Sequence, residues 1–381
     1  MKQYSDPIEN LRKLVGFRSV SNSPNLDICE WIATACTSFG FDCELEKADH
    51  DPAKANVIAT IGPKTRGGLI LSGHLDVVPT NGQPWKTDPF NLTEQNGRFY
   101  GRGTCDMKGF IASTLAALSL VDLNKVHKPL VLIWTYDEEI GCKGSAHHLE
   151  KRKVLQDWYP REALIGEPTD FHIFRMHPGH VSFRIMISGR AAHSSKPDLG
   201  HSAIKEATKL LNILNELEID LQKERRLENF FERPFVTFNI GTIKGGQAVN
   251  IVPDHCEIEV GYRPLPGDNP KEVFHRFSER LQSIDKSMSG IEVEIRSITP
   301  ALLTDDDIPL KTLLMPHAAT KTLGAASFAT DAGNFAGLGI KSLIFGPGSI
   351  DVAHRADEFI EGDALISTQG IIADIIRRRC E

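Results

Sequence analysis

Short apolar segments alternate with helical patterns along much of the chain, and this alternation constrains the fold more than any other feature. The apolar segments are four to six residues long and bounded by glycine or polar residues, which is typical of strands buried on both faces of a sheet. Helical patterns between them predict an α/β domain whose sheet is covered by helices on both faces. The predicted strands are residues 56–60, 68–72, 130–135, 163–166 and 341–345, and the predicted helices are residues 5–15, 26–39, 108–120, 145–151 and 364–378.

The middle of the chain has a different pattern, in the order β-α-β-β-α-β. Such an order predicts a compact sheet with helices on one face. Because the α/β pattern returns after it, we expect a module of residues 179–296 inserted into a domain made of residues 1–178 and 297–381. The predicted elements of the module are strands at 181–188, 235–243, 256–263 and 291–296 and helices at 201–217 and 270–284.

Composition excludes several classes of protein. A chain of 381 residues is longer than single cores usually become, about 250–300 residues, so two domains are expected. The net charge of −7 predicts neither nucleic acid nor an anionic membrane as partner. No stretch approaches the roughly 20 apolar residues of a membrane span, and the first residues, MKQYSDP, predict no signal peptide. Seven scattered cysteines without a CxxC pair indicate reduced thiols and a cytoplasmic location.

Polar side chains at the ends of the apolar strands are the candidates for chemistry. In open α/β sheets, sites lie outside the carboxyl ends of the strands. Two imidazoles and three carboxylates gathered there suit Zn²⁺ or another borderline divalent ion. The five residues are His74, Asp106, Glu139, Glu167 and His354.

Two more carboxylates next to these positions have predicted roles. Asp76 could accept the second imidazole N–H of His74 and so fix its tautomer. If one Asp is shared between two ions, about 3.5–4 Å apart, each ion keeps a position for water, whose pKa it lowers towards about 7. Glu138 then becomes the natural general base.

Simpler interpretations of the same residues stay open. The run Asp137-Glu138-Glu139 could be a solvated acidic loop, and Asp106 could merely cap a helix. The glycine-rich turn at residues 101–109 could cradle a phosphate, although the order G-x-x-x-x-G-K-[ST] is absent and an acidic residue stands where an anion would dock.

The motifs as a set resemble the dinuclear-zinc aminoacylase and carboxypeptidase superfamily, and within it the acetylornithine deacetylases. The resemblance covers essentially the whole length. Two departures, IGCKGS at 140–145 and Asp331 where those deacetylases often carry Glu, bear on the choice of amino acid rather than on hydrolysis. The matching motifs are GHLD at 73–76, WKTDPF at 85–90, GTCDMKG at 103–109, DEE at 137–139, GEPT at 166–169, YRPLPG at 262–267, GPGSI at 346–350 and AHRADE at 353–358.

The resemblance implies a metal site and a fold. It implies a mixed sheet sandwiched by helices, with the insert as a ferredoxin-like lid and dimerisation domain that makes the chain a homodimer. Two divalent ions, zinc or possibly cobalt, would share Asp106. One would also bind His74 and Glu167, and the other Glu139 and His354. A cis peptide bond would follow Asp106.

Further roles follow from the same resemblance. Glu138 would act as base and pass its proton to the leaving amine, and Asp76 would orient His74. His193 of the insert would stabilise the oxyanion. The residues expected to meet the substrate are Asn250, Arg263 and Gly348.

The implied reaction is hydrolysis of the amide bond of an N-acyl amino acid. The leading substrate is N-acetyl-L-ornithine, giving L-ornithine and acetate in arginine biosynthesis. Alternatives are desuccinylation of N-succinyl-diaminopimelate, deacylation of another N-acyl amino acid and hydrolysis of a dipeptide. A non-catalytic metal-binding protein is a further alternative, but such a protein has no need of a base at Glu138.

Overall fold

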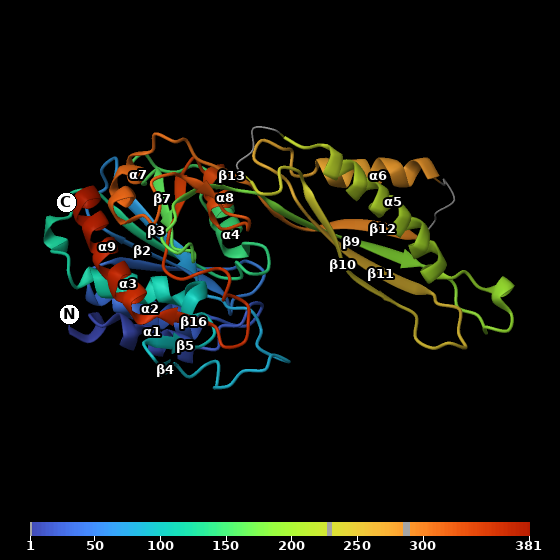
Figure 1. Ribbon diagram of the computed structural model, residues 1–381, viewed down its shortest axis with the longest axis horizontal. Helices are drawn as coiled ribbons and strands as arrows, with labels where there is room; N and C mark the ends of the chain where they lie inside the picture. Colours follow the sequence, from blue (N-terminus) through green and yellow to red (C-terminus); the bar gives the residue numbers. More distant parts are fainter. Residues whose placement is uncertain (1, 227–230, 285–289) are drawn as a thin grey trace. The chain divides into compact units, whose positions relative to one another are not determined.

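The computed structural model describes residues 2–226, 231–284 and 290–381 and divides into two compact units (Figure 1). The first unit comprises Met1–Met176, Leu302–Ala325 and Thr330–Glu381, and the second comprises His177–Ala301 and Ala326–Ala329. The division falls at 301/302 rather than at 296/297 because the last strand of the insert continues to Thr299, which pairs with His180.

Within its described residues, the first unit contains a nine-stranded mixed sheet in the order β1-β2-β6-β3-β7-β15-β8-β13, with β14 beside β8. Four central strands, β6, β3, β7 and β15, are parallel, so their carboxyl ends share one edge. Strand β1 is antiparallel to β2, β2 is antiparallel to β6, and β8 is antiparallel to β15. The bounds are β1 (Asp42–Lys47), β2 (Ala55–Ile61), β3 (Leu69–His74), β6 (Leu130–Thr135), β7 (Glu162–Ile165), β8 (Phe174–His177), β13 (Leu302–Leu303), β14 (Gly324–Ala325) and β15 (Lys341–Ile344).

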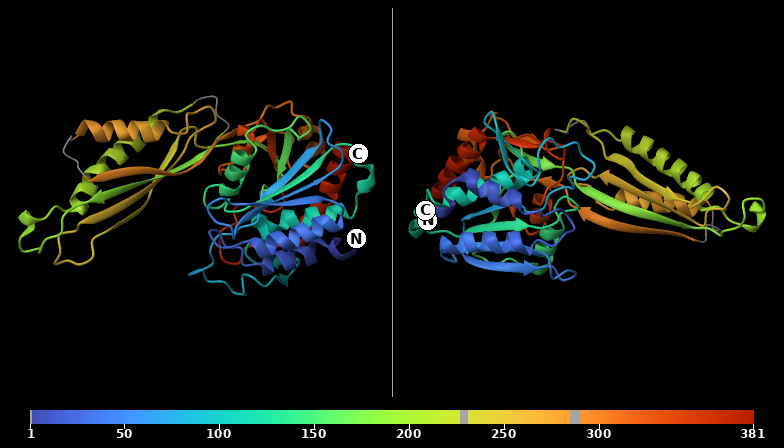
Figure 2. Two further views of the ribbon diagram at one scale, coloured as in Figure 1. Left: turned by 180° about the vertical axis from the view of Figure 1, so that it is seen from behind. Right: turned by 90° about the horizontal axis from the view of Figure 1, so that it is seen from below.

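Helices cover both faces of this sheet (Figure 2). Alternate strand residues such as Leu69 and Leu71 form one hydrophobic cluster with residues of α1, α2, α3, α7 and α9. Thr135 faces the other side, where its hydroxyl donates to Asp331 at the start of α8. Helix α4 packs against β2, β6 and α8. The bounds are α1 (Pro7–Gly16), α2 (Leu26–Ser38), α3 (Gly109–Leu118), α4 (Lys143–Lys151), α7 (Pro309–Leu314), α8 (Ala332–Gly337) and α9 (Gly362–Cys380).

The second unit has the ferredoxin-like order of strands. Its antiparallel sheet runs β10-β11-β9-β12, and α5 and α6 pack on one face. Alternate residues of β9, such as Phe183 and Ile185, form its core with Leu210 of α5 and Phe277 of α6. The bounds are β9 (His180–Ser188), α5 (Ala203–Lys223), β10 (Thr237–Gly245), β11 (His255–Arg263), α6 (Glu272–Ile284) and β12 (Ile291–Thr299).

Some elements were not predicted. Strand β1 has the sequence DCELEK, whose alternating charges lack the apolar run that marked the other strands. A small sheet in the order β16-β5-β4 lies beside the loop that carries Asp106. Its strands are β4 (Thr93–Gln95), β5 (Arg98–Tyr100) and β16 (Phe359–Glu361). In the described part of the chain, no helix combines the length and apolar character needed to cross a bilayer.

Candidate metal centre

The sheet brings polar side chains together at the shared carboxyl edge of its parallel strands. His74 is the last residue of β3, and Glu139 and Glu167 follow β6 and β7. Asp106 lies in a short helical turn, η2 (Thr104–Lys108), just before α3. His354 comes from the segment between β15 and β16.

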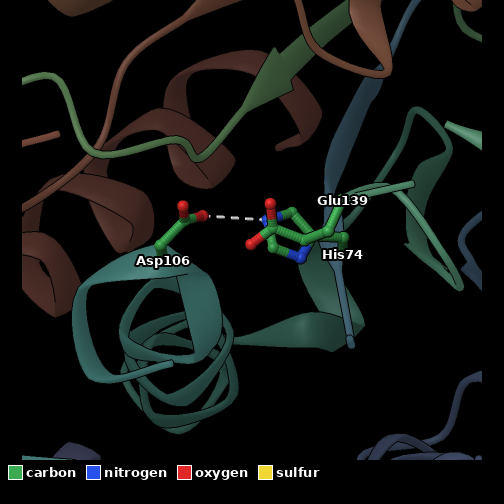
Figure 3. A group of neighbouring side chains, drawn as sticks. All are labelled: His74, Asp106 and Glu139. Atoms are coloured by element: carbon green, nitrogen blue, oxygen red, sulfur yellow. Dashed lines mark hydrogen bonds and ion pairs between the residues drawn. The ribbon is translucent and has the colours of Figure 1, made fainter. Parts of the chain in front are cut away.

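Asp106 contacts two imidazoles, those of His74 and His354, and Figure 3 shows its contact with His74 next to Glu139. Its Oδ1 is 2.9 Å from His74 Nε2, and its Oδ2 is 3.2 Å from His354 Nε2. Glu167 Oε2 lies 4.0 Å from His74 Nε2, and Glu139 Oε2 lies 2.9 Å from His354 Nε2. These contacts divide the five residues into two groups of three that share Asp106. The peptide bond between Asp106 and Met107 is cis.

The hydrogen bonding of His74 requires a proton or a metal cation between its ring and Asp106. His74 Nδ1 lies 2.9 Å from the main-chain oxygen of Asp76, and a carbonyl only accepts, so Nδ1 carries a hydrogen. In a neutral ring Nε2 would then direct a lone pair at a carboxylate oxygen 2.9 Å away. A proton or a metal cation must therefore lie between the two atoms.

Burial makes the ionised forms of the clustered carboxylates unfavourable. It raises the pKa of Glu138 and of Glu167 well above the ordinary value. Burial, followed by the neighbouring Asp106, raises the pKa of Glu139 to about 7. Hydrogen bonds to Asp106 and Glu139 raise the pKa of His354 to about 10. Burial acts to raise the pKa of Asp106, but its hydrogen bonds to the two imidazoles outweigh burial and lower it.

The donor set fits divalent cations. Among the ion pairs formed by the described residues, none joins a lysine or arginine to Glu138, Glu139 or Glu167. His74, Asp106 and Glu139 offer ligand atoms within 4.8 Å of one another. Imidazole nitrogens mixed with carboxylate oxygens are the ligands that zinc and similar ions take in hydrolases.

Comparison with known proteins gives the family. The model of peptidase family M20/M25/M40 matches residues 70–378. The chain is 34% identical to an acetylornithine deacetylase of Photorhabdus laumondii subsp. laumondii, over 98% of this chain and 97% of that protein. The chain belongs to the peptidase family M20/M25/M40. It is a metal-dependent hydrolase of amide or peptide bonds.

Solved structures agree with the fold of this family. The M20 family metallo-carboxypeptidase Sso-CP2 of Sulfolobus solfataricus superposes with a TM-score of 0.81 at 19% identity, covering 97% of this chain and 98% of that one. The YXEP protein of Bacillus subtilis, described as a dinuclear metal binding peptidase from the M20 family, gives a TM-score of 0.63 at 15% identity, covering 97% of each chain.

Asp76 was predicted to accept the N–H of His74 through its carboxylate, but the structure shows a different contact. Its main-chain oxygen, not its carboxylate, accepts from His74 Nδ1; the nearer carboxylate oxygen is 3.8 Å away. The carboxylate instead accepts from the backbone N–H groups of Glu138 and Glu139, at 3.0 and 3.3 Å, and from the hydroxyl of Ser21 at 2.7 Å. Asp76 therefore fixes the loop that carries the candidate base as well as the ring of His74.

Glu358 is a further anchor that sequence reasoning missed. Its buried carboxylate accepts from the backbone N–H groups of Gly103, Cys105 and Asp106, at 3.0, 2.9 and 3.0 Å. It also pairs with buried Arg102 at 2.7 Å. The only sequence signal was its place in the motif AHRADE, four residues after His354. Glu358 holds the turn that presents Asp106.

Gly348 lies beside the turn that carries Asp106. Its φ is +80°, and a Cβ there would come within 2.6 Å of Cys105 Sγ, so a side chain at this position would collide. Its carbonyl accepts from the backbone N–H of Asp170 at 2.7 Å. The positive φ and the close approach of Cys105 explain why a glycine is required there.

The remaining three predicted residues belong to the second unit. His193 and Asn250 lie in paired segments, in which Ser194 N–H donates to the Asn250 carbonyl at 3.0 Å. Ser195 N–H donates to His193 Nδ1 at 3.2 Å, so in the neutral ring Nε2 carries the hydrogen and is a donor. Arg263 ends β11, and burial lowers its pKa.

We expect Glu358→Ala to loosen Asp106. The variant leaves three N–H groups and a buried guanidinium without their acceptor, so it should lower the free energy of unfolding by about 3–5 kcal/mol. It should also weaken zinc binding by roughly 10–100-fold. Urea denaturation of the metal-free protein and zinc titration measure the two effects.

The matched control is Glu361→Ala, which removes an exposed carboxylate three residues away that pairs with Arg98. Its effect should stay within about 0.5 kcal/mol. If Glu358→Ala bound zinc as tightly as wild type and unfolded at the same urea concentration, Glu358 would not organise the turn.

Proposed function

We propose that the chain removes the acyl group from the nitrogen of an amino acid, acting on N-acetyl-L-ornithine to give L-ornithine and acetate for arginine biosynthesis. The observation that carries this proposal is the placement of Asp106 between two imidazoles, with Glu138 adjacent in sequence to Glu139. The 34% identity to an acetylornithine deacetylase supports the choice of substrate. The enzyme would act in the cytoplasm, apart from membranes and nucleic acids.

Two divalent ions, zinc or alternatively cobalt, would occupy the centre. We assign His74, Asp106 and Glu167 to one ion and Asp106, Glu139 and His354 to the other, following the two groups of contacts. When bound, such ions act as Lewis acids on the amide carbonyl and lower the pKa of water.

Glu138 is the proposed general base. Its carboxylate is half-buried beside the ligands, and burial raises its pKa well above the ordinary value. A carboxylate held at this position can accept a proton from a water molecule. The carboxylic acid so formed can then give that proton to the amine as the C–N bond breaks. Asp76 keeps Glu138 in place through the backbone N–H at 3.0 Å.

The second unit is the proposed lid and homodimerisation domain, and it would supply three residues that meet the substrate. The N–H at His193 Nε2 suits a developing oxyanion, because a neutral donor there needs no change of tautomer. The planar guanidinium of Arg263 suits an α-carboxylate. Asn250 would add a polar contact, and Gly348 of the first unit would meet the substrate through its backbone.

A substrate panel tests the proposed reaction. Purified enzyme loaded with zinc should hydrolyse N-acetyl-L-ornithine with a kcat/KM at least about tenfold above that for N-succinyl-diaminopimelate, other N-acetyl amino acids or dipeptides. Released amine is measured for each compound. Faster desuccinylation or dipeptide hydrolysis would assign the chain to another branch of the family.

Removing the base tests the chemistry. Glu138→Gln keeps the shape of the side chain but cannot accept a proton, so kcat should fall by roughly 10²–10⁴-fold while two metal ions per chain remain by elemental analysis. Glu94→Gln, an exposed position in β4, serves as the control and should keep wild-type kcat. A Glu138→Gln enzyme within tenfold of wild type would refute this role.

A further inference from the structure

We propose that Cys142 is a positioning residue, whose thiol holds the Glu138 carboxylate in the orientation needed for proton transfer. The inference rests on the proposed function, because it concerns the base of that reaction. The residue lies in the segment 140–145 that departs from the pattern of the acetylornithine deacetylases.

A direct contact joins the two side chains. Cys142 Sγ lies 3.3 Å from Glu138 Oε1, and a carboxylate accepts where a thiol donates. The cysteine side chain is buried, with 2% of its surface exposed. The loop closes tightly around this contact, since the backbone N–H groups of Gly141 and Cys142 donate to the Glu138 carbonyl at 3.0 and 2.8 Å.

The backbone conformation of Cys142 would suit a glycine better. Its φ of 52° and ψ of 42° lie in the left-handed region, where a Cβ is unfavourable and glycine is the usual residue. A side chain at this position carries a cost in conformational energy. The contact with Glu138 accounts for a cysteine, rather than a glycine, at this position.

Two helices hold the cysteine in place. Its carbonyl accepts from the backbone N–H of Ala146 in α4 at 3.0 Å. The same carbonyl accepts from the side-chain amide of Asn334 in α8 at 3.2 Å. The backbone of Cys142 is therefore held in place, so its thiol can restrict the rotamers of Glu138.

A metal ligand is the competing role for the same thiol. Glu138, Cys142 and Asp331 offer atoms within 4.8 Å of one another. However, the two oxygens of Asp331 already accept hydrogen bonds from Ser145 and Thr135, each at 2.5 Å. A positioning role for Cys142 therefore explains the contacts better than a role as metal ligand. The metal content of Cys142→Ala distinguishes the two roles.

Three substitutions in the full-length, zinc-loaded enzyme test the proposal. Cys142→Ala removes the donor, Cys142→Gly removes it while relieving the left-handed backbone, and Cys142→Ser restores a donor. We expect the alanine and glycine variants to lose roughly 10–100-fold in kcat, with KM within about twofold and metal content unchanged. The serine variant should recover most of the loss.

Glycine separates positioning from simple structural support. If Cys142 only maintained the loop, Cys142→Gly would match or exceed wild-type stability and keep its kcat. The control is Cys29→Ala, which removes another buried thiol, one that donates to the Ala55 carbonyl, and it should keep wild-type kcat.

The outcomes distinguish the two proposals. Wild-type kcat in Cys142→Ala, or loss of a metal ion from it, overturns the positioning role even if Glu138→Gln is inactive. Full activity in Glu138→Gln instead overturns the role of Glu138 as base, and failure to hydrolyse N-acetyl-L-ornithine in the substrate panel overturns the proposed function. In the Glu138→Gln background, Cys142→Ala should cause no additional loss, because the group that it positions is already inert.

Discussion

Electrostatic repulsion at one edge of a sheet is the constraint on which the site depends. Asp106, Glu138, Glu139 and Glu167 converge beside His74 in a largely buried region, and no lysine or arginine of the described chain pairs with the three glutamates. Burial of unpaired carboxylates is unfavourable. Divalent cations remove that cost, so the fold and the metal centre stabilise each other.

Backbone N–H groups prepare the site before any cation binds. Asp76 receives those of Glu138 and Glu139, and Glu358 receives those of the turn around Asp106. A carboxylate that accepts several N–H bonds fixes the path of a loop as well as a side chain. Because these ligands are already in place, they do not have to reorganise during the reaction, as flexible ligands would.

Much of this arrangement could be predicted from sequence, for a simple reason. Parallel strands end at one edge, so a polar residue after each apolar run, as at His74 and Glu167, marks a common place in space. The insert was predictable because its elements follow the order β-α-β-β-α-β. Strand β1 was missed because its apolar residues alternate with charged ones and form no continuous apolar run. Anchors such as Glu358 could not be assigned, because sequence does not show which N–H groups a carboxylate will accept.

The most direct test of the account is to locate the metal ions themselves. Anomalous diffraction at the zinc absorption edge, from crystals of the zinc-loaded protein, should show two peaks next to the Asp106 carboxylate. One should lie next to His74 and Glu167 and the other next to Glu139 and His354. A single peak, or peaks that leave Asp106 outside the coordination shell, would contradict a shared aspartate at a dinuclear centre.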